Sequence, residues 1–377
     1  MDRAQFVAEL FSGAPQHERF DRMTEIFPHA TMRASPNPLR FPQGAPADLP
    51  ETFPQDGAAC ETARLLAETG TAALLVLHHG AVRFERYWLT GGEKVRWASM
   101  SVAKSLISAA VGIAVSEGAI GGVDEPITAY VPALRGSAYD GVAIRDVLQM
   151  SSGAGWNEDY GDPDSDINRF LRVFAGGGPF GAFVASLHRE REPGTYNLYN
   201  SADTQALGML LATATGRTIR DYVEERLWHP LGAEADACWL VDRDDVEMAF
   251  GGLNATARDY ARMGELYRLG GRWQGRQLVP VEWVKASVTP DAPHLVPGRR
   301  ETSGSVLGYG YQWWVMDGTE GEYSAIGVYN QFVYVNPARG AVIVKLSASR
   351  DYAASGDERS WRELQTIALF RAIAGML

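Results

Sequence analysis

The chain has 377 residues, of which 46% are hydrophobic, 21% charged and 10% aromatic. This length and composition are typical of a folded protein with a large core and two lobes, and they exclude a disordered chain or a small disulfide-stabilised scaffold. The formal net charge of −11 disfavours binding to nucleic acid or to an anionic membrane surface.

The cysteines and the apolar segments indicate the cellular location of the protein. Cys60 and Cys238 are far apart in the chain, so they form neither a disulfide framework nor a zinc ribbon. The N-terminal residues lack the basic region and the apolar run of a signal peptide. The most apolar stretch, residues 102–115, is too short to span a bilayer and predicts a buried core helix. We therefore expect a cytoplasmic protein with no membrane partner.

The first half of the chain predicts an arm, a hairpin and a run of helices. Residues 1–55 are rich in Pro, Phe and Arg and are expected to lie as an arm over the main body, with no assigned chemistry. Residues 72–78 and 82–88, on either side of Gly80, predict a β-hairpin. Helical patterns follow at 101–116, 143–150, 183–189, 202–213, 218–227 and 256–269.

The C-terminal third predicts an antiparallel meander and a closing helix. Strands are expected at 309–316, 323–326, 331–335 and 342–347, and the helix at 358–373. The simplest arrangement is an α/β (α+β) fold, in which an antiparallel sheet flanked by helices carries an inserted all-helical domain. The predicted division is an N-terminal arm (1–55), a discontinuous α/β domain (56–100 and 285–377) and a helical domain (101–284).

The most informative motif is Ser101-Val102-Ala103-Lys104, which begins the most apolar predicted helix of a chain with only four lysines. Positions i and i+3 share one helix face, so the hydroxyl can meet the amine. Burial disfavours the ammonium and lowers the lysine pKa, which provides a neutral amine as general base. Free N–H groups at the helix start would stabilise an oxyanion. The motif predicts a serine nucleophile with its base; the alternative is an N-cap serine followed by a surface lysine.

A second motif supports the first. Pro193-Gly194 is followed by Tyr199-Asn200-Ser201, and with the Ser-x-x-Lys tetrad it resembles the active-site elements of the β-lactamase-related serine hydrolases, which include class C β-lactamases, penicillin-binding proteins and family VIII carboxylesterases. Within this superfamily the chain is most similar to 6-aminohexanoate-dimer hydrolases. The stretches that carry this similarity are residues 100–105, 157–163, 199–202, 251–252, 256–259, 312–314 and 342–347.

The resemblance implies a class C β-lactamase-like fold and a set of site residues. It implies Ser101 as nucleophile, Lys104 as base and Tyr199 as proton relay, with an oxyanion hole formed by the N–H groups of Ser101 and Val328. The candidate substrate-binding residues are Tyr160, which would donate to the substrate amide, and Trp313, Tyr329 and Asn330. Alternation along a strand would put Tyr309, Tyr311 and Trp313 on one face, where sheet core is the alternative role.

The third family element departs from the family pattern. The matching segment, residues 327–331, contains neither Lys nor Thr, so it lacks the usual anchor for the carboxylate of a β-lactam or D-Ala-D-Ala substrate. Tyr199-Asn200-Ser201 also lacks the Asn of Tyr-x-Asn. Both differences favour esters or linear amides as substrates.

Metal chemistry is not expected. The seven histidines include no His-x-x-x-His pair, and Asp162, Asp164 and Asp166 lack the glycine and glutamate of a calcium loop, so they predict a solvated turn. The sequence thus predicts a serine hydrolase without cofactor or metal, acting on a small-molecule ester or amide through an acyl-enzyme on Ser101. A homodimer is left open. The alternatives are an acyltransferase with an amine acceptor, a β-lactamase or D,D-peptidase, and a non-catalytic binding protein of the same fold.

Overall fold

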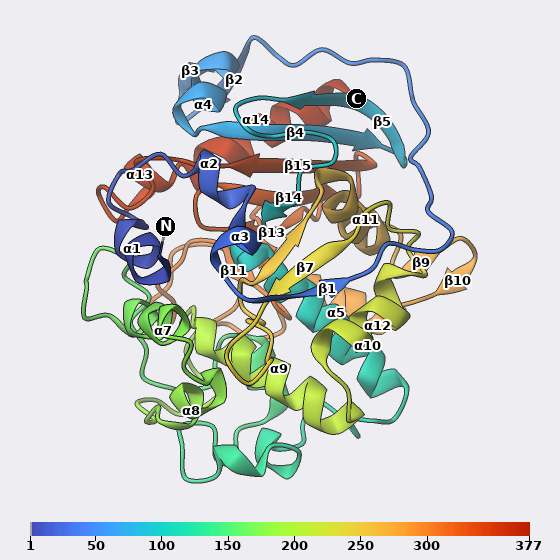
Figure 1. Ribbon diagram of the computed structural model, residues 1–377. Coiled ribbons are helices and arrows are strands. Elements are labelled where there is room, and N and C mark those ends of the chain that lie inside the picture. Colours follow the sequence, from blue (N-terminus) through green and yellow to red (C-terminus); the bar gives the residue numbers. More distant parts are fainter. Residues whose placement is uncertain (1) are drawn as a thin grey trace.

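The computed structural model describes residues 2–377, and its largest sheet joins strands from both ends of the chain (Figure 1). This sheet has seven antiparallel strands in the order β11-β12-β13-β14-β15-β4-β5. The strands are β4 (Thr71–His78), β5 (Ala81–Tyr87), β11 (Gly308–Tyr309), β12 (Trp314–Val315), β13 (Tyr323–Gly327), β14 (Gln331–Asn336) and β15 (Ala341–Ser347). The early hairpin therefore lies beside the late meander through the pairing of β4 with β15.

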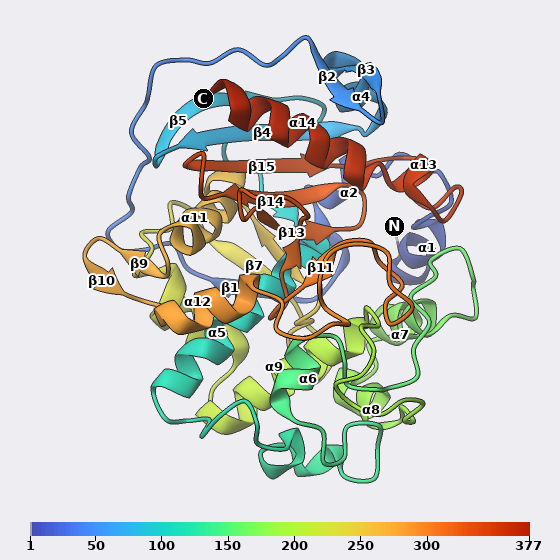
Figure 2. The same ribbon diagram turned by 180° about the vertical axis from the view of Figure 1, so that it is seen from behind.

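Two cores form on the two faces of this sheet because side chains alternate along each strand. Leu75, Leu77 and Val344 belong to the larger core, which also contains residues of α5 (Ala103–Ser116) and α11 (Ala257–Arg268). The neighbouring residues Leu74 and Val76 belong to the second core, under α14 (Glu363–Met376). Figure 2 shows α14 lying along the sheet.

The helices of the middle of the chain lie below the sheet in Figure 1. They are α5, η2 (Ile127–Ala129), η3 (Pro132–Leu134), α6 (Ile144–Leu148), α7 (Asp166–Ala175), α8 (Phe180–Ala185), α9 (Ser201–Thr215), α10 (Ile219–Val223) and the π-helical turn η4 (Glu224–Trp228). The central helix α5 packs closely against α9 and α12. At Gly112 a Cβ atom would come within 2.5 Å of the Trp283 ring, so only glycine permits this approach.

A four-stranded antiparallel sheet connects the N-terminal segment to the body. Its order is β1-β7-β8-β6, and its strands are β1 (His29–Met32), β6 (Trp97–Ala98), β7 (Ala237–Leu240) and β8 (Leu253–Ala255). The remaining elements are α1 (Arg3–Glu9), α2 (His17–Phe20), α3 (Met23–Ile26), β2 (Thr52–Gln55), β3 (Ala58–Glu61), α4 (Thr62–Glu68), β9 (Arg272–Trp273), β10 (Arg276–Gln277), α12 (Val281–Val288) and α13 (Glu358–Trp361). In both ribbon views α1 lies between α13 and α7.

The expected antiparallel sheet flanked by helices is confirmed, as are the hairpin and most of the helices. The expectation of one strand over 309–316 is wrong, because the chain turns at Gln312, whose φ is 62°, and β11 pairs with β12 as a hairpin. The closing helix is interrupted at Arg362, where φ is 51°. The helix expected at 183–189 lies earlier, at Phe180–Ala185. The division into domains stays a prediction; α11, from the expected helical domain, packs on the main sheet.

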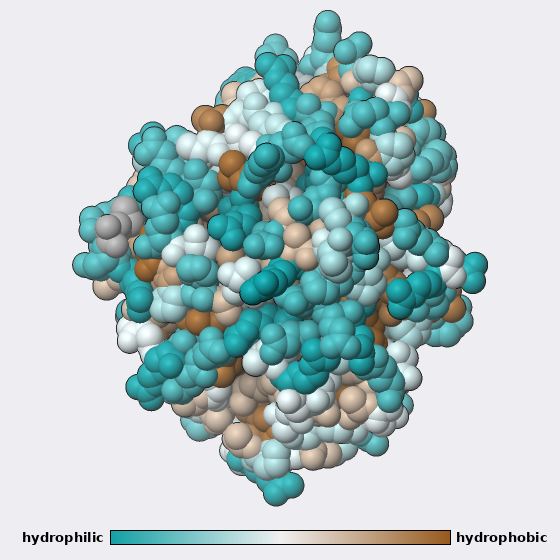
Figure 3. Space-filling model, turned by 45° about the vertical axis from the view of Figure 1, so that its right-hand side comes forward, coloured by the Kyte–Doolittle hydropathy of each residue, from teal (hydrophilic) through white to brown (hydrophobic). Residues whose placement is uncertain are grey.

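The surface matches the acidic, polar composition. On the face in Figure 3 hydrophilic residues predominate, and hydrophobic residues form small separate patches. Among residues 2–377 no helix combines the length and the apolar character needed to cross a bilayer.

Candidate active site

Ser101 lies at the point where the main sheet meets the helical region. It is the middle residue of η1 (Met100–Val102), the 3-10 turn that leads into α5, and η1 contacts both β13 and β14. The preceding residue, Met100, has a φ of 47°, an uncommon conformation for a side chain of this kind. Ser101 is 8% exposed, so the residue is largely buried.

Lys104 follows one turn later on the same helix face, as the i, i+3 spacing predicts. Its Nζ donates to the Ser201 Oγ (3.1 Å) and the carbonyl oxygen of Phe250 (2.9 Å), and it lies within hydrogen-bond distance of the Ser101 Oγ (2.9 Å). Its side chain is buried, and in the described chain it forms no ion pair within 4.0 Å. The alternative of a surface lysine is therefore wrong.

Glu158 binds the hydroxyl group of Ser201, which is one of the three neighbours of the Lys104 amine. Ser201 donates its hydroxyl proton to the Glu158 Oε1 over 2.7 Å, and its backbone N–H donates to the Oε2 over 3.1 Å. The Tyr160 hydroxyl donates to the Oε1 as well, over 2.9 Å, and the Trp156 indole N–H donates to the Oε2. Because the only proton of the Ser201 hydroxyl is held by Glu158, this hydroxyl can only accept from Lys104.

These contacts fix the proton arrangement around Lys104. The Phe250 carbonyl and the Ser201 hydroxyl are both acceptors, so they take two N–H groups of the amine. A neutral amine then has its lone pair left for the third neighbour, Ser101. The site therefore suits a neutral lysine that accepts the proton of the Ser101 hydroxyl.

The pKa of Lys104 supports the same arrangement. Burial lowers this pKa from 10.5 to about 7, and the negative charge of Glu158 partly opposes that shift. At neutral pH a large fraction of the amine is consequently uncharged, as a general base requires.

Tyr199 lies beside the same two residues. Its ring stacks on Trp314 with centroids 5.1 Å apart, and the Lys104 Nζ is 5.1 Å from the centre of the Tyr199 ring. Burial, followed by the nearby Glu158 charge, raises the Tyr199 pKa far above its ordinary value, while a hydrogen bond with Ser101 lowers it in part. Its hydroxyl thus stays protonated at neutral pH and can donate a proton, while Lys104 provides the base.

The end of β13 packs against the backbone of the candidate nucleophile. Gly327, its last residue, lies against Ser101, and Val328 begins a tight turn in which Tyr329 and Asn330 have φ values of 65° and 70°. The N–H groups of Ser101 and Val328 donate to no acceptor within residues 2–377. Both are therefore available to a developing oxyanion.

The four candidate substrate-binding residues fall into two groups. Tyr160 contacts the site through Glu158, and Tyr329, which is buried, lies on the other side of Phe11 and accepts the Phe11 N–H at its hydroxyl. Trp313 is fully buried between Tyr267 and Tyr323, in the larger core. It does not line the site, because the turn at Gln312 directs its side chain into this core.

Asn330 is also fully buried, and its side chain supports the turn from behind. Its Oδ1 accepts from the Lys345 Nζ (2.9 Å) and the Thr366 hydroxyl (2.8 Å), and its Nδ2 donates to the Trp361 carbonyl (2.7 Å). Every polar atom of this amide group is thus occupied by protein. The structure places Asn330 beneath the oxyanion turn and away from Ser101.

Sequence reasoning missed the groups that act through Lys104. Glu158 lies in the 157–163 stretch and Ser201 ends the Tyr199 motif, so both occurred in matching segments without an assigned role. Phe250 contributes its backbone carbonyl oxygen. Every residue has this group, so the residue type at this position does not predict the contact.

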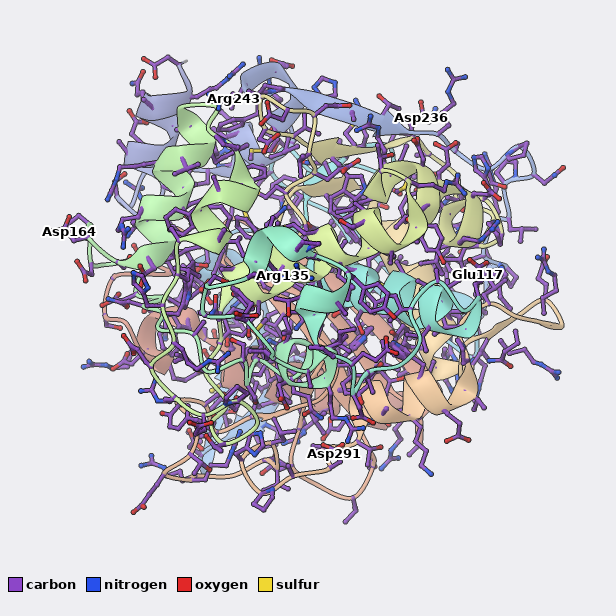
Figure 4. The ribbon with its side chains drawn as sticks, turned by 90° about the horizontal axis from the view of Figure 1, so that it is seen from below. Glu117, Arg135, Asp164, Asp236, Arg243 and Asp291 are labelled. Atoms are coloured by element: carbon purple, nitrogen blue, oxygen red, sulfur yellow. The ribbon has the colours of Figure 1, made fainter. Side chains whose placement is uncertain are left out.

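The aspartates of residues 162–166 organise a surface turn. The Asp162 Oδ1 accepts the Asp164 N–H over 2.9 Å, and its Oδ2 accepts from Asn157. Figure 4 places Asp164 at the outer edge of the molecule, away from the centre where the helices pack. Among the residues that the structure describes, no group of three His, Cys, Asp or Glu side chains is placed to hold a metal ion.

Comparison with known proteins gives three kinds of match. The Beta-lactamase family model matches residues 62–368. A 6-aminohexanoate-dimer hydrolase from Paenarthrobacter ureafaciens is 34% identical over 309 residues, which are 80% of this chain and 77% of that protein.

Two solved structures share the fold. A Bacillus anthracis protein provisionally assigned as a 6-aminohexanoate-dimer hydrolase is 23% identical, with a TM-score of 0.84 over 95% of this chain and 93% of its own. EstCE1, described as a hydrolase with promiscuous acyltransferase activity, is 16% identical, with a TM-score of 0.60 over 82% of this chain and 96% of its own.

Proposed function

Because the chain belongs to the Beta-lactamase family and is a serine hydrolase, we propose that it hydrolyses esters or linear amides through an acyl-enzyme on Ser101. The observation that carries this proposal is the contact of 2.9 Å between the Lys104 Nζ and the Ser101 Oγ, with the other two neighbours of the amine restricted to accepting.

Acylation begins when neutral Lys104 takes the proton of the Ser101 hydroxyl. The Ser101 Oγ attacks the carbonyl carbon, and the carbonyl oxygen becomes an oxyanion held by the N–H groups of Ser101 and Val328. The bond to the leaving amine or alcohol then breaks. The proton held by Lys104 returns to this leaving group through the Tyr199 hydroxyl, whose raised pKa keeps it protonated until that step.

Deacylation uses the same groups in reverse. A water molecule takes the place of the leaving group and gives a proton towards Lys104 through Tyr199 as its oxygen attacks the ester carbon. The bond to the Ser101 Oγ breaks, and Lys104 returns the proton to this oxygen. Water and the acyl group thus leave as a carboxylic acid, and both residues regain their starting protonation states.

The turn after β13 supports esters and linear amides over antibiotics. Residues 327–331 contain no cation, and the nearby Lys345 is fully buried. Its Nζ donates to Thr69 (3.0 Å), Asn330 (2.9 Å) and Ser347 (2.6 Å), so it does not replace the missing anchor for a substrate carboxylate. The relative from Paenarthrobacter ureafaciens, named for the 6-aminohexanoate dimer, makes linear amides of this kind the first amide substrates to test.

The test combines active-site labelling with a substrate panel. A fluorophosphonate probe is expected to label the wild type at Ser101, and p-nitrophenyl butyrate and 6-aminohexanoate dimer are expected to be hydrolysed faster than a chromogenic cephalosporin. Ser101→Ala should abolish labelling and turnover. Ser116→Ala, at the far end of the same helix, is the matched control and should retain both.

Two results would contradict the proposal. A folded wild type that is neither labelled nor active would indicate a binding protein, and predominant amide formation in the presence of an added amine would indicate an acyltransferase. The proposal includes a small-molecule ester or amide as substrate and a cytoplasmic location, while a homodimer stays a prediction that light scattering can test.

A further inference from the structure

Phe11 of the N-terminal arm packs against two tyrosines of the candidate active site. Its ring centre lies 4.3 Å from that of Tyr160 and 5.0 Å from that of Tyr329, and the planes of Phe11 and Tyr329 are inclined by only 17°. The backbone N–H of Phe11 also donates to the Tyr329 hydroxyl over 2.8 Å. Three segments that are far apart in the sequence therefore meet at this ring.

The arm holds Phe11 in an unusual conformation. Helix α1 ends at Glu9, and Phe11 follows with a φ of 61°, a value that aromatic residues rarely adopt. Such conformations persist only where the surroundings determine them, and they are concentrated at functional sites.

Contacts on both sides of Phe11 fix the arm. Before it, Phe6 packs against Phe27, with ring centres 5.2 Å apart, and Phe27 stacks on Phe174 of α7 at 4.2 Å. After it, Phe20 is fully buried and packs edge-on against Tyr329 at 4.9 Å. Packed residues on both sides therefore hold the segment that carries Phe11.

The two tyrosines that contact Phe11 adjoin different groups of the candidate site. Tyr160 donates to Glu158, the carboxylate that fixes the protons around Lys104. Tyr329 directly follows Val328, the candidate oxyanion donor. The half-buried ring of Phe11 therefore lies between a tyrosine that contacts Glu158 and a tyrosine that adjoins Val328.

We propose that Phe11 is a specificity-determining residue of this hydrolase, an apolar wall that favours narrow, unbranched chains and excludes branched or cyclic ones. This inference rests on the proposed function. The arm lies outside residues 62–368, the part of the chain that the family model matches, so this wall is a property of this chain's own N-terminal segment.

The test measures a ratio of substrates. For wild type, Phe11→Ala and Phe11→Leu, kcat/KM is determined with p-nitrophenyl esters of butyric and cyclohexanecarboxylic acid, and with butyl and cyclohexyl butyrate. The ratio of kcat/KM for the cyclic substrate to kcat/KM for the linear one is expected to rise about tenfold in Phe11→Ala, for the acyl pair, the alcohol pair or both. The rise should be smaller in Phe11→Leu, as is usual when an apolar pocket gains volume. Phe41→Ala, in the same N-terminal segment but packed against Trp273, is the matched control and should leave both ratios unchanged.

Ratios that stay within twofold of wild type in both series, or a parallel loss on all four substrates, would overturn the inference, because a merely structural arm affects all substrates alike. If Phe11→Ala does not fold, as judged by circular dichroism, the ratios of Phe11→Leu decide. A wild type that is neither active nor labelled by the fluorophosphonate overturns the proposed function and this inference together, whereas an active enzyme with unchanged ratios overturns the inference alone.

Discussion

Gly327 lies so close to the nucleophile that a Cβ atom at this position would be 3.0 Å from the backbone nitrogen of Ser101. The same Cβ would be 2.8 Å from the carbonyl oxygen of Ser99. Both of these neighbours are backbone atoms, which cannot move aside as the end of a flexible side chain can. Only glycine therefore lets the end of β13, next to Val328, pack this closely against the backbone of Ser101.

Gly327→Ala is expected to lower kcat by about 10²–10³, the usual cost of losing one oxyanion donor, because the methyl group pushes the end of β13 away from Ser101. Steady-state kinetics with p-nitrophenyl butyrate measure the loss. Gly304→Ala is the matched control, since a Cβ at that position has no neighbour within 4 Å. Unchanged activity in a folded Gly327→Ala variant would refute an oxyanion hole at this strand end.

The pH dependence of the wild type should follow Lys104. Its active form is the neutral amine, and burial brings its pKa to about 7, so kcat/KM should rise with pH through this value and fall about tenfold per unit below it. Initial rates between pH 5 and pH 9 test this expectation. A profile that rises only near the ordinary lysine pKa would mean that Lys104 is not the base.

Lys104→Met is expected to abolish turnover and also to change how stability depends on pH. Because the folded pKa is lowered, the unfolded wild type binds a proton more readily than the folded protein between about pH 7 and 10.5. Wild-type stability should therefore fall by about 1.4 kcal/mol per unit as pH decreases through this window. Urea unfolding at several pH values should show this contribution in the wild type and its loss in the variant. Identical pH dependence in both proteins would disprove the lowered pKa.

Glu158→Gln removes the charge of Glu158 and keeps one oxygen that accepts from two of its four donors, while its amide nitrogen leaves the other two without an acceptor. The Glu158 charge raises the Lys104 pKa, so its removal should move the acid limb of the pH profile to lower pH. Glu190→Gln is the control, an exposed residue with no contact to the site. A shift of the limb to higher pH would show that Glu158 does not act on Lys104 in this way.

Asn330→Ala should lower the free energy of unfolding by about 2–4 kcal/mol, because it removes three buried hydrogen bonds and puts alanine in a left-handed conformation. Asn330→Gly removes only the hydrogen bonds, so it should be less destabilised. Urea titrations give these values. For a residue that positions the oxyanion turn, kcat should fall with little change in KM, and a raised KM at unchanged kcat would instead support direct substrate binding by Asn330.

Local patterns predicted the regular parts of the fold. The apolar segment before Gly80 indicated β4, which pairs with β15 and is buried except at His78. The sequence did not predict the turn at Gln312 or the interruption at Arg362, because both depend on positive φ values at residues that ordinarily avoid them. Surrounding contacts impose such conformations, and no local pattern encodes these contacts.

The sequence by itself predicted the pairing of Ser101 with Lys104 from their i, i+3 spacing, with a capping serine and a surface lysine as the alternative. Only the tertiary structure decided the state of that pair. Burial sets the pKa of Lys104, and Glu158, Ser201 and the Phe250 carbonyl direct its protons from positions more than 50 residues away in the chain. Charge and hydrogen bonding act through space, so residue spacing predicted the catalytic pair, while the chain fold that brings these distant groups together determined their chemistry.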